Sequence, residues 1–199
     1  MHIWTINKWE KFYDVTKKGY RTGVRLKFDK NVDDEVRRAC KEFVAWLRTM
    51  YFFPIRVPIY IKHLEKIKAL DGEYVVATCF LPSDRFAEPY IRVTAGDYYL
   101  MKEKNGQDNA LAAILGSIIH ELTHYFQWVN DLQLTEIGTE RQAKNYVKII
   151  LSEYAETREH PYNHNLRIAT LDGAMEQQPM LIEYLAHHLD KEWQMVIMQ

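Results

Sequence analysis

His120 and His124 stand four residues apart in the segment IIHELTHYFQW (118–128), and Glu121 directly follows the first of them. On an α-helix each residue turns by about 100°, so the two imidazoles would lie about 40° apart on one face. Two imidazoles at this spacing can bind one tetrahedral zinc ion, which takes a third protein ligand and keeps an open position for water. Glu121 is then placed to accept a proton from that water. The pattern therefore predicts His120 and His124 as metal ligands and Glu121 as a general base.

The helix predicted to carry these residues begins near Asp108 or Asn109 and has one apolar face. Its apolar side chains fall within one sector of the helical wheel, away from both histidines; they are Leu111, Ile114, Leu115, Ile118, Ile119, Leu122, Tyr125, Phe126 and Val129. The histidines share their side with Ala113, Gly116 and Ser117, whereas a solvated face usually carries Lys, Glu and Arg. Two ordinary surface histidines are the alternative interpretation. The small residues favour a cleft, or a second element packed opposite.

The segment does not contain a third ligand of its own. The pattern HExxHxxGxxH would need Gly at 127 and His at 130, where this chain has Gln127 and Asn130. No histidine occurs between 124 and 160. The other common solution is a carboxylate from the following helix. That helix is predicted to start at a possible capping box, TERQ (139–142), and to run to about His160, before Pro161.

The end of this second helix, ILSEYAETREH (150–160), offers the candidate carboxylates. Glu153 lies on the edge of the predicted inward face, and Glu156 lies further round the helix. Burying a carboxylate is unfavourable unless it is paired or bound to metal. Glu153 is therefore the predicted third ligand and Glu156 the alternative, with a histidine such as His160 or His164 also open. An ordinary solvated helix face is the non-functional interpretation of both glutamates.

The remaining segments predict an α+β fold: one helix, a small sheet, then three helices. Pro58 inside the second predicted strand favours an edge strand or a bulge there. Residues 96–109 are predicted to form a loop or a short helical turn. The predicted strands are 23–28, Ile55–Ile61, Tyr74–Leu81 and Tyr90–Ala95, and the predicted helices start at Asn31, near Asp108, near 139 and at Pro179, the last ending at Met198.

Length and composition predict one domain over residues 1–199, since the chain is 47% hydrophobic and can bury a core. No membrane span and no signal peptide are expected. Cys40 and Cys79 are the only cysteines and are predicted as plain core residues. Two cysteines are too few for a disulfide framework, so a cytoplasmic location is expected. Residues 1–70 carry 16 Lys/Arg against 8 Asp/Glu. This basic third permits a nucleic-acid partner, although its basic residues are scattered rather than clustered.

The HELTH motif and its surroundings, roughly Tyr90 to His160, resemble the zincin metallopeptidases, in the branch where a helix-borne Glu completes an HExxH site. HELTHYFQW is also similar to small zincin-like proteins of bacteria and their phages. The resemblance implies a zincin-like core, a Zn²⁺ cofactor, a peptide or protein substrate, and Tyr90–Ala95 as a sheet edge on which substrate lies extended. The family includes members that act on DNA-associated proteins. SEYAET departs from the Asn-Glu-x-x-x-Asp and Glu-x-x-Ala-Asp patterns of relatives, so the third ligand stays open.

The sequence thus predicts a zinc-dependent peptidase, with zinc held by His120, His124 and Glu153 (alternatively Glu156) and Glu121 as the base. Two alternatives remain. One is a non-catalytic zinc-binding module, in which the ion joins two helices. The other is a DNA-associated protein that uses the basic N-terminal third.

Overall fold

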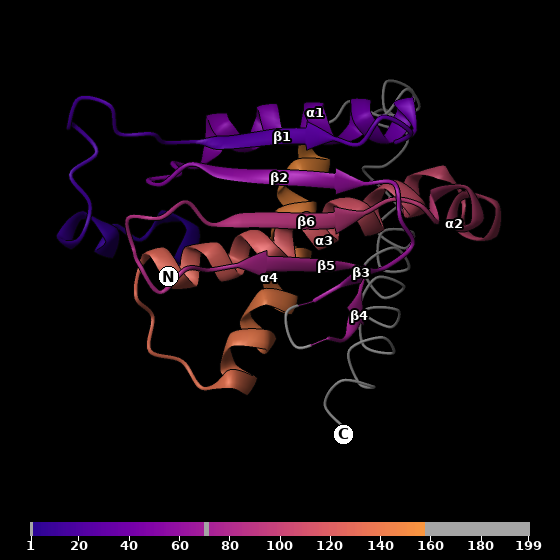
Figure 1. Ribbon diagram of the computed structural model, residues 1–199. Helices are drawn as coiled ribbons and strands as arrows, with labels where there is room; N and C mark the ends of the chain where they lie inside the picture. The colour runs from indigo at the N-terminus through magenta and orange to yellow at the C-terminus, as the bar shows by residue number, and fades with distance from the viewer. Residues whose placement is uncertain (1, 70–71, 158–199) are drawn as a thin grey trace, which may run out of the picture. The chain divides into compact units, whose positions relative to one another are not determined.

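The computed structural model describes residues 2–69 and 72–157 (Figure 1). The chain divides into two compact units, Met1–Val147 and Lys148–Gln199, and each is described by itself. The described part is mixed α+β, as the sequence predicts. The predicted helix at 179–198, His160 and His164 lie outside the described residues. Most of the second unit also lies outside the described residues, so the single domain over 1–199 stays a prediction.

A four-stranded mixed sheet with strand order β1-β2-β6-β5 forms the centre of the first unit (Figure 1). The first three strands of that order run parallel, and β5 runs antiparallel to β6. Ile59 of β2 pairs with Leu26 on one side and Ile91 on the other, which fixes the register across the middle of the sheet. The strands are β1 (Val24–Phe28), β2 (Val57–Lys62), β5 (Ala77–Phe80) and β6 (Tyr90–Thr94), with a separate antiparallel pair β3 (Ile67–Lys68) and β4 (Tyr74–Val75).

Pro58 lies in an interior strand, so the prediction of an edge strand or bulge at this point is wrong. β2 pairs with β1 and with β6. Successive backbone N–H groups of a strand point to opposite sides, and the N–H of Val57 donates to Gly23 O at 2.9 Å, towards β1. The N–H that Pro58 lacks would therefore face β6, and the pairing with β6 begins only at Ile59. The proline removes no ladder bond at this position.

The strand before the HELTH helix is not the sheet edge, which corrects a second expectation. β6 (Tyr90–Thr94) lies between β2 and β5, and β5 is the outer strand on that side. The single strand predicted at 74–81 is divided, because Tyr74–Val75 pairs with β3 whereas Ala77–Phe80 pairs with β6. The edge next to the HELTH helix is thus formed by the antiparallel strand β5.

Four α-helices accompany the sheet in the described residues: α1 (Asp34–Met50), α2 (Tyr98–Asn105), α3 (Gln107–Val129) and α4 (Glu136–Glu156). Asp33 caps α1 by accepting a hydrogen bond from the N–H of Glu35 at 2.8 Å. The sequence does not clearly predict α2. Gly106 separates it from α3 with φ of 85°, a left-handed conformation that glycine adopts without strain.

The core lies between the sheet and helices α1 and α3. α1 packs on β1, α3 packs on β5 and β6, and the two helices also contact each other. The predicted apolar face of α3 is buried from Ile114 to Val129, while Leu111 is half-buried. Cys40 is fully buried on α1, as predicted, and Cys79 in β5 is partly exposed. No helix in the described ranges combines the length and apolar character needed to cross a membrane.

The N-terminal segment is packed against the helices that carry the site. The N–H of Ile3 donates to the Tyr146 hydroxyl of α4 at 2.6 Å, and the Trp4 indole N–H donates to Thr123 Oγ1 of α3 at 3.3 Å. The N–H of Trp9 donates to Asn130 Oδ1, just after α3, at 3.2 Å. All three bonds are buried, so residues 3–9 act as a strap that fixes α3 and α4.

Candidate metal centre

The two histidines of HELTH lie side by side on α3 with their Nε2 atoms 3.0 Å apart. Their rings are nearly perpendicular, with centroids 4.8 Å apart. The His120 side chain is 1% exposed and that of His124 is 14% exposed. The sequence therefore correctly predicts that they share one face, and this face is covered by a second element rather than solvated, as the small residues beside them favour.

A carboxylate from α4 lies against both imidazoles. Glu140 Oε1 is 3.2 Å from His124 Nε2, and Glu140 Oε2 is 3.3 Å from His120 Nε2. In the part of the chain that the structure describes, these three residues form a group that could hold a metal ion, since one ligand atom from each lies within 4.8 Å of the others. The structure thus places a carboxylate of the following helix beside the histidines, as the sequence predicts, but from an unexpected position.

Neither Glu153 nor Glu156 belongs to the group at the two histidines. Both follow Glu140 in the same helix, by 13 and 16 residues. An α-helix advances by about 1.5 Å per residue, so 13 residues correspond to about 20 Å of helix. Within α4, neither residue could bind the same ion as Glu140. The third position of the group is occupied by Glu140 in place of the predicted Glu153.

Glu140 lies near the start of α4, whereas the carboxylates considered from the sequence, Glu153 and Glu156, lie near its end. The possible capping box at 139–142 is not the helix start, because α4 begins at Glu136. The Thr135 hydroxyl caps it by accepting a hydrogen bond from the N–H of Gly138 at 3.1 Å. One further turn of helix, residues 136–139, is therefore present, and Glu140 lies just after it. Its spacing of three residues to Ala143 and seven to Val147, both buried, was the available signal.

α3 is fixed to the rest of the core by polar side chains on its other faces. The hydroxyl of Tyr125 donates to Ile55 O at 2.8 Å and accepts from Ile55 N–H at 3.0 Å. Tyr125 is fully buried, and Ile55 is 5% exposed. Thr123, which accepts from Trp4, donates its own hydroxyl to Ile119 O within the helix at 2.8 Å. These bonds hold the backbone on which His120 and His124 are mounted.

The acidic groups of the site have shifted pKa values. Burial raises the pKa of the Glu121 carboxyl, and nearby Glu140 raises it further, while the two histidines oppose the shift. Burial would also raise the pKa of Glu140, but hydrogen bonds from His120 and His124, with their positive charge, outweigh it and lower that pKa. Burial would lower the pKa of His124, but its contact with Glu140 and the charge of Glu121 raise it overall. The site thus contains one carboxyl held as an anion and another that binds a proton more tightly than usual.

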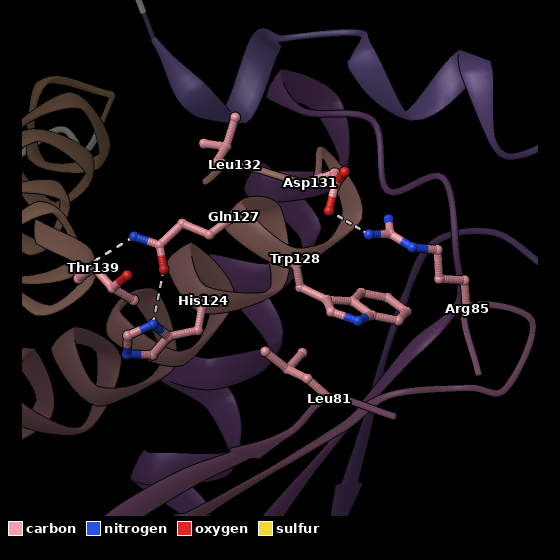
Figure 2. Close-up of a pocket in the computed structure, with 8 residues that line it drawn as sticks. All are labelled: Leu81, Arg85, His124, Gln127, Trp128, Asp131, Leu132 and Thr139. Carbon is pink, nitrogen blue, oxygen red and sulfur yellow. Dashed lines mark hydrogen bonds and ion pairs between the residues drawn. The ribbon is translucent and has the colours of Figure 1, made fainter. Parts of the chain in front are cut away.

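A pocket of about 250 Å³ opens beside His124. Figure 2 shows His124 and Gln127 on one side of it, Trp128 at its centre, and the ion pair of Arg85 with Asp131 on the other side. Its lining combines apolar surface with polar groups that lie close to the histidines. The lining residues are Leu81, Arg85, His124, Gln127, Trp128, Asp131, Leu132 and Thr139.

In comparisons with known proteins, no family model, no curated protein and no solved structure matches the chain.

Proposed function

We propose that His120, His124 and Glu140 bind a zinc ion and that the protein is a zinc-dependent peptidase with Glu121 as its general base. The observation that carries the proposal is the convergence of two imidazole nitrogens and a carboxylate, from two helices, on one point. A fourth residue, Glu121, is buried next to them. The peptide substrate, and the assignment of the fold as zincin-like, come from the resemblance of HELTH and its surroundings to the zincin family.

The donor set and its spacing fit zinc. Zinc binds His nitrogen and Glu oxygen at about 2.0–2.2 Å in a tetrahedral arrangement, which separates neighbouring ligand atoms by about 3.3 Å. The two imidazole nitrogens here are 3.0 Å apart, and each faces a different oxygen of Glu140: Oε1 is 3.2 Å from His124 Nε2, and Oε2 is 3.3 Å from His120 Nε2. Three electron-pair donors at such short range favour a cation between them. Two histidines and one glutamate also leave a fourth position open, as catalytic zinc sites do.

Bound there, zinc would lower the pKa of a water molecule and polarise a carbonyl group. Glu121 would take the proton from that water and deliver it to the leaving amine. A raised pKa suits this role, because a carboxylate that binds its proton more tightly is a stronger base. Glu140 is suited to ligation because its carboxyl remains ionised at neutral pH.

The pocket beside His124 favours a catalytic centre over the alternative of an ion that only joins two helices. Structural zinc sites are closed by four protein ligands. Here three protein ligands are brought together, and one of them lines a pocket of about 250 Å³. A substrate group in this pocket would lie next to the ion.

Metal binding is tested first, by mass spectrometry of protein purified without chelator or affinity tag, followed by zinc titration. The wild type should bind about one zinc per chain, Glu140→Ala should bind much more weakly, and Glu153→Ala should resemble the wild type. Glu153→Ala is the matched control, since it removes a glutamate from the same helix. Loss of zinc in Glu153→Ala but not in Glu140→Ala would refute the ligand assignment. Absence of zinc binding in the wild type would refute the whole proposal.

Hydrolysis is tested separately, with a mixture of fluorogenic peptides and unfolded protein substrates. Glu121→Gln should still bind zinc but lose hydrolysis, because the amide cannot accept the proton. A wild type that binds zinc without hydrolysing any substrate would favour the non-catalytic alternative. Hydrolysis that persists in Glu121→Gln would exclude Glu121 as the base.

A further inference from the structure

We infer that Gln127 is a positioning residue that sets the tautomer of His124 and holds Glu140 in place relative to it, an inference that rests on the proposed function. The sequence analysis uses Gln127 only to exclude the HExxHxxGxxH pattern, in which a glycine stands at this position. In the structure Gln127 is 5% exposed and lies on α3, one turn after His124.

The amide of Gln127 makes three hydrogen bonds, two of which Figure 2 shows. Its oxygen is 2.9 Å from His124 Nδ1, and its nitrogen donates to Thr139 O and to Gln142 Oε1, both at 3.0 Å. Thr139 O is a backbone carbonyl and can only accept, so the amide nitrogen must face it. The amide oxygen consequently faces His124, and the orientation of the side chain is determined.

This orientation fixes which nitrogen of His124 carries the hydrogen. An amide oxygen can only accept, so His124 Nδ1–H is the donor in the bond to Gln127. Without a cation, Nε2 can also donate to the Glu140 carboxylate. A bound cation would take the place of that hydrogen and use the lone pair of Nε2, while Nδ1–H stays with Gln127. Nε2 is the atom that faces His120 and Glu140, at 3.0 and 3.2 Å. Gln127 thus selects the tautomer in which the nitrogen that faces the candidate metal position can bind a cation.

The same side chain connects the two helices that bear the proposed ligands. His124 lies on α3, whereas Thr139 and Gln142 lie on α4 on either side of Glu140 in the sequence, Thr139 directly before it. One buried amide therefore holds a proposed ligand of the first helix and the backbone next to the proposed ligand of the second. Residues that orient metal ligands in this way commonly contribute about 10- to 100-fold to metal affinity.

The affinity test measures zinc binding by competition with a chromogenic chelator and records the visible spectrum of the cobalt-substituted protein. Gln127→Met keeps the length of the side chain but removes all three bonds. It should weaken zinc binding by about 10- to 100-fold and change the cobalt spectrum, because the ligands are no longer held in place. Gln142→Met removes only one bond and should have a smaller effect. Gln133→Met, at an exposed position after α3, is the control and should bind zinc like the wild type. Unchanged affinity in Gln127→Met would refute the inference.

A second measurement tests the inference without metal, so that its failure differs from failure of the proposed function. Nitrogen NMR of the metal-free protein, assigned by comparison with His124→Asn, reports which ring nitrogens of His124 carry a hydrogen. Nδ1 of the wild type should carry one, whether or not Nε2 also donates to Glu140, and Gln127→Met should lower the share of rings with Nδ1–H. A wild type with a hydrogen on Nε2 alone would overturn the inference even if zinc binds. A wild type with Nδ1–H that binds no zinc would refute the proposed function and leave the contact between Gln127 and His124 supported.

Discussion

Tyr125→Phe should destabilise the protein by removing the double hydrogen bond between α3 and Ile55. The substitution deletes one oxygen atom and leaves the ring packing unchanged, so the effect isolates these bonds. The hydroxyl serves both the carbonyl oxygen and the N–H of Ile55, at 2.8 and 3.0 Å, in a fully buried setting. A buried polar group that loses its partner costs about 1–3 kcal/mol. Two such groups give an expected loss of about 2–6 kcal/mol in the free energy of unfolding.

Equilibrium unfolding in urea measures this loss directly, provided that the dependence on denaturant is the same in both proteins. Tyr60→Phe is the matched control, because the Tyr60 hydroxyl accepts from Lys27 Nζ at an exposed position and its removal should change stability by no more than about 0.5 kcal/mol. A loss below about 1 kcal/mol in Tyr125→Phe, with an unchanged slope, would refute the reasoning. It would mean that the backbone groups of Ile55 find other partners and that the two hydrogen bonds to Tyr125 do not anchor α3.

One further prediction concerns the same tyrosine, and three concern other parts of the molecule. Burial raises the pKa of Tyr125 well above 10, so its stabilising effect should be complete below about pH 10 and decline above it; the difference in stability between wild type and Tyr125→Phe, measured against pH, should therefore shrink only in strong alkali. Gly96→Ala should lower the free energy of unfolding by at least about 1–3 kcal/mol, because the new Cβ would lie 2.4 Å from the carbonyl carbon of Leu64. A variant that unfolds at the same urea concentration as the wild type would contradict this. Burial raises the pKa of Cys40 to about 12, so at pH 8 mass spectrometry should find it alkylated only after unfolding, and rapid labelling of the folded protein would argue against its burial. Zinc at about 100 times its dissociation constant should raise the free energy of unfolding by about 2.7 kcal/mol, and a chelator should reverse the shift; Glu140→Ala, unfolded under the same conditions, should show neither effect.

The helices and most strands could be predicted from sequence because their apolar residues follow a clear period. α1 is the plainest case: Val36, Cys40, Phe43 and Leu47 recur at helical spacing and are all buried. The position of β2 could not be predicted in this way. Whether a proline is tolerated inside a sheet depends on which neighbour its missing N–H would face, and this follows from strand order, which no local pattern contains.

The candidate site shows the same division between local and tertiary information. His120, Glu121 and His124 are local, because a helix places residues four apart on one face whatever surrounds it. Glu140 depends on which end of α4 lies against α3. It stands near the start of the helix, whereas the carboxylates considered from the sequence, Glu153 and Glu156, stand near its end. Only the tertiary packing brings the start of α4 to the histidines. Gln127 required the structure, since its partners lie on another helix.

The strap formed by residues 3–9 has a consequence for the order in which the protein can form. Ile3 and Tyr146 are 143 residues apart, Trp9 and Asn130 are 121 apart, and Trp4 and Thr123 are 119 apart. A ribosome that adds about 5–20 residues per second needs about 7–30 s between synthesis of Ile3 and of Tyr146. For most of that time Trp4 and Trp9 have been made, but their hydrogen-bond partners Thr123 and Asn130 have not. Contacts of such high sequence separation also slow folding. The centre at His120 and Glu140 can therefore be completed only late in synthesis, and a chaperone that shields the early segment would have its effect in this interval.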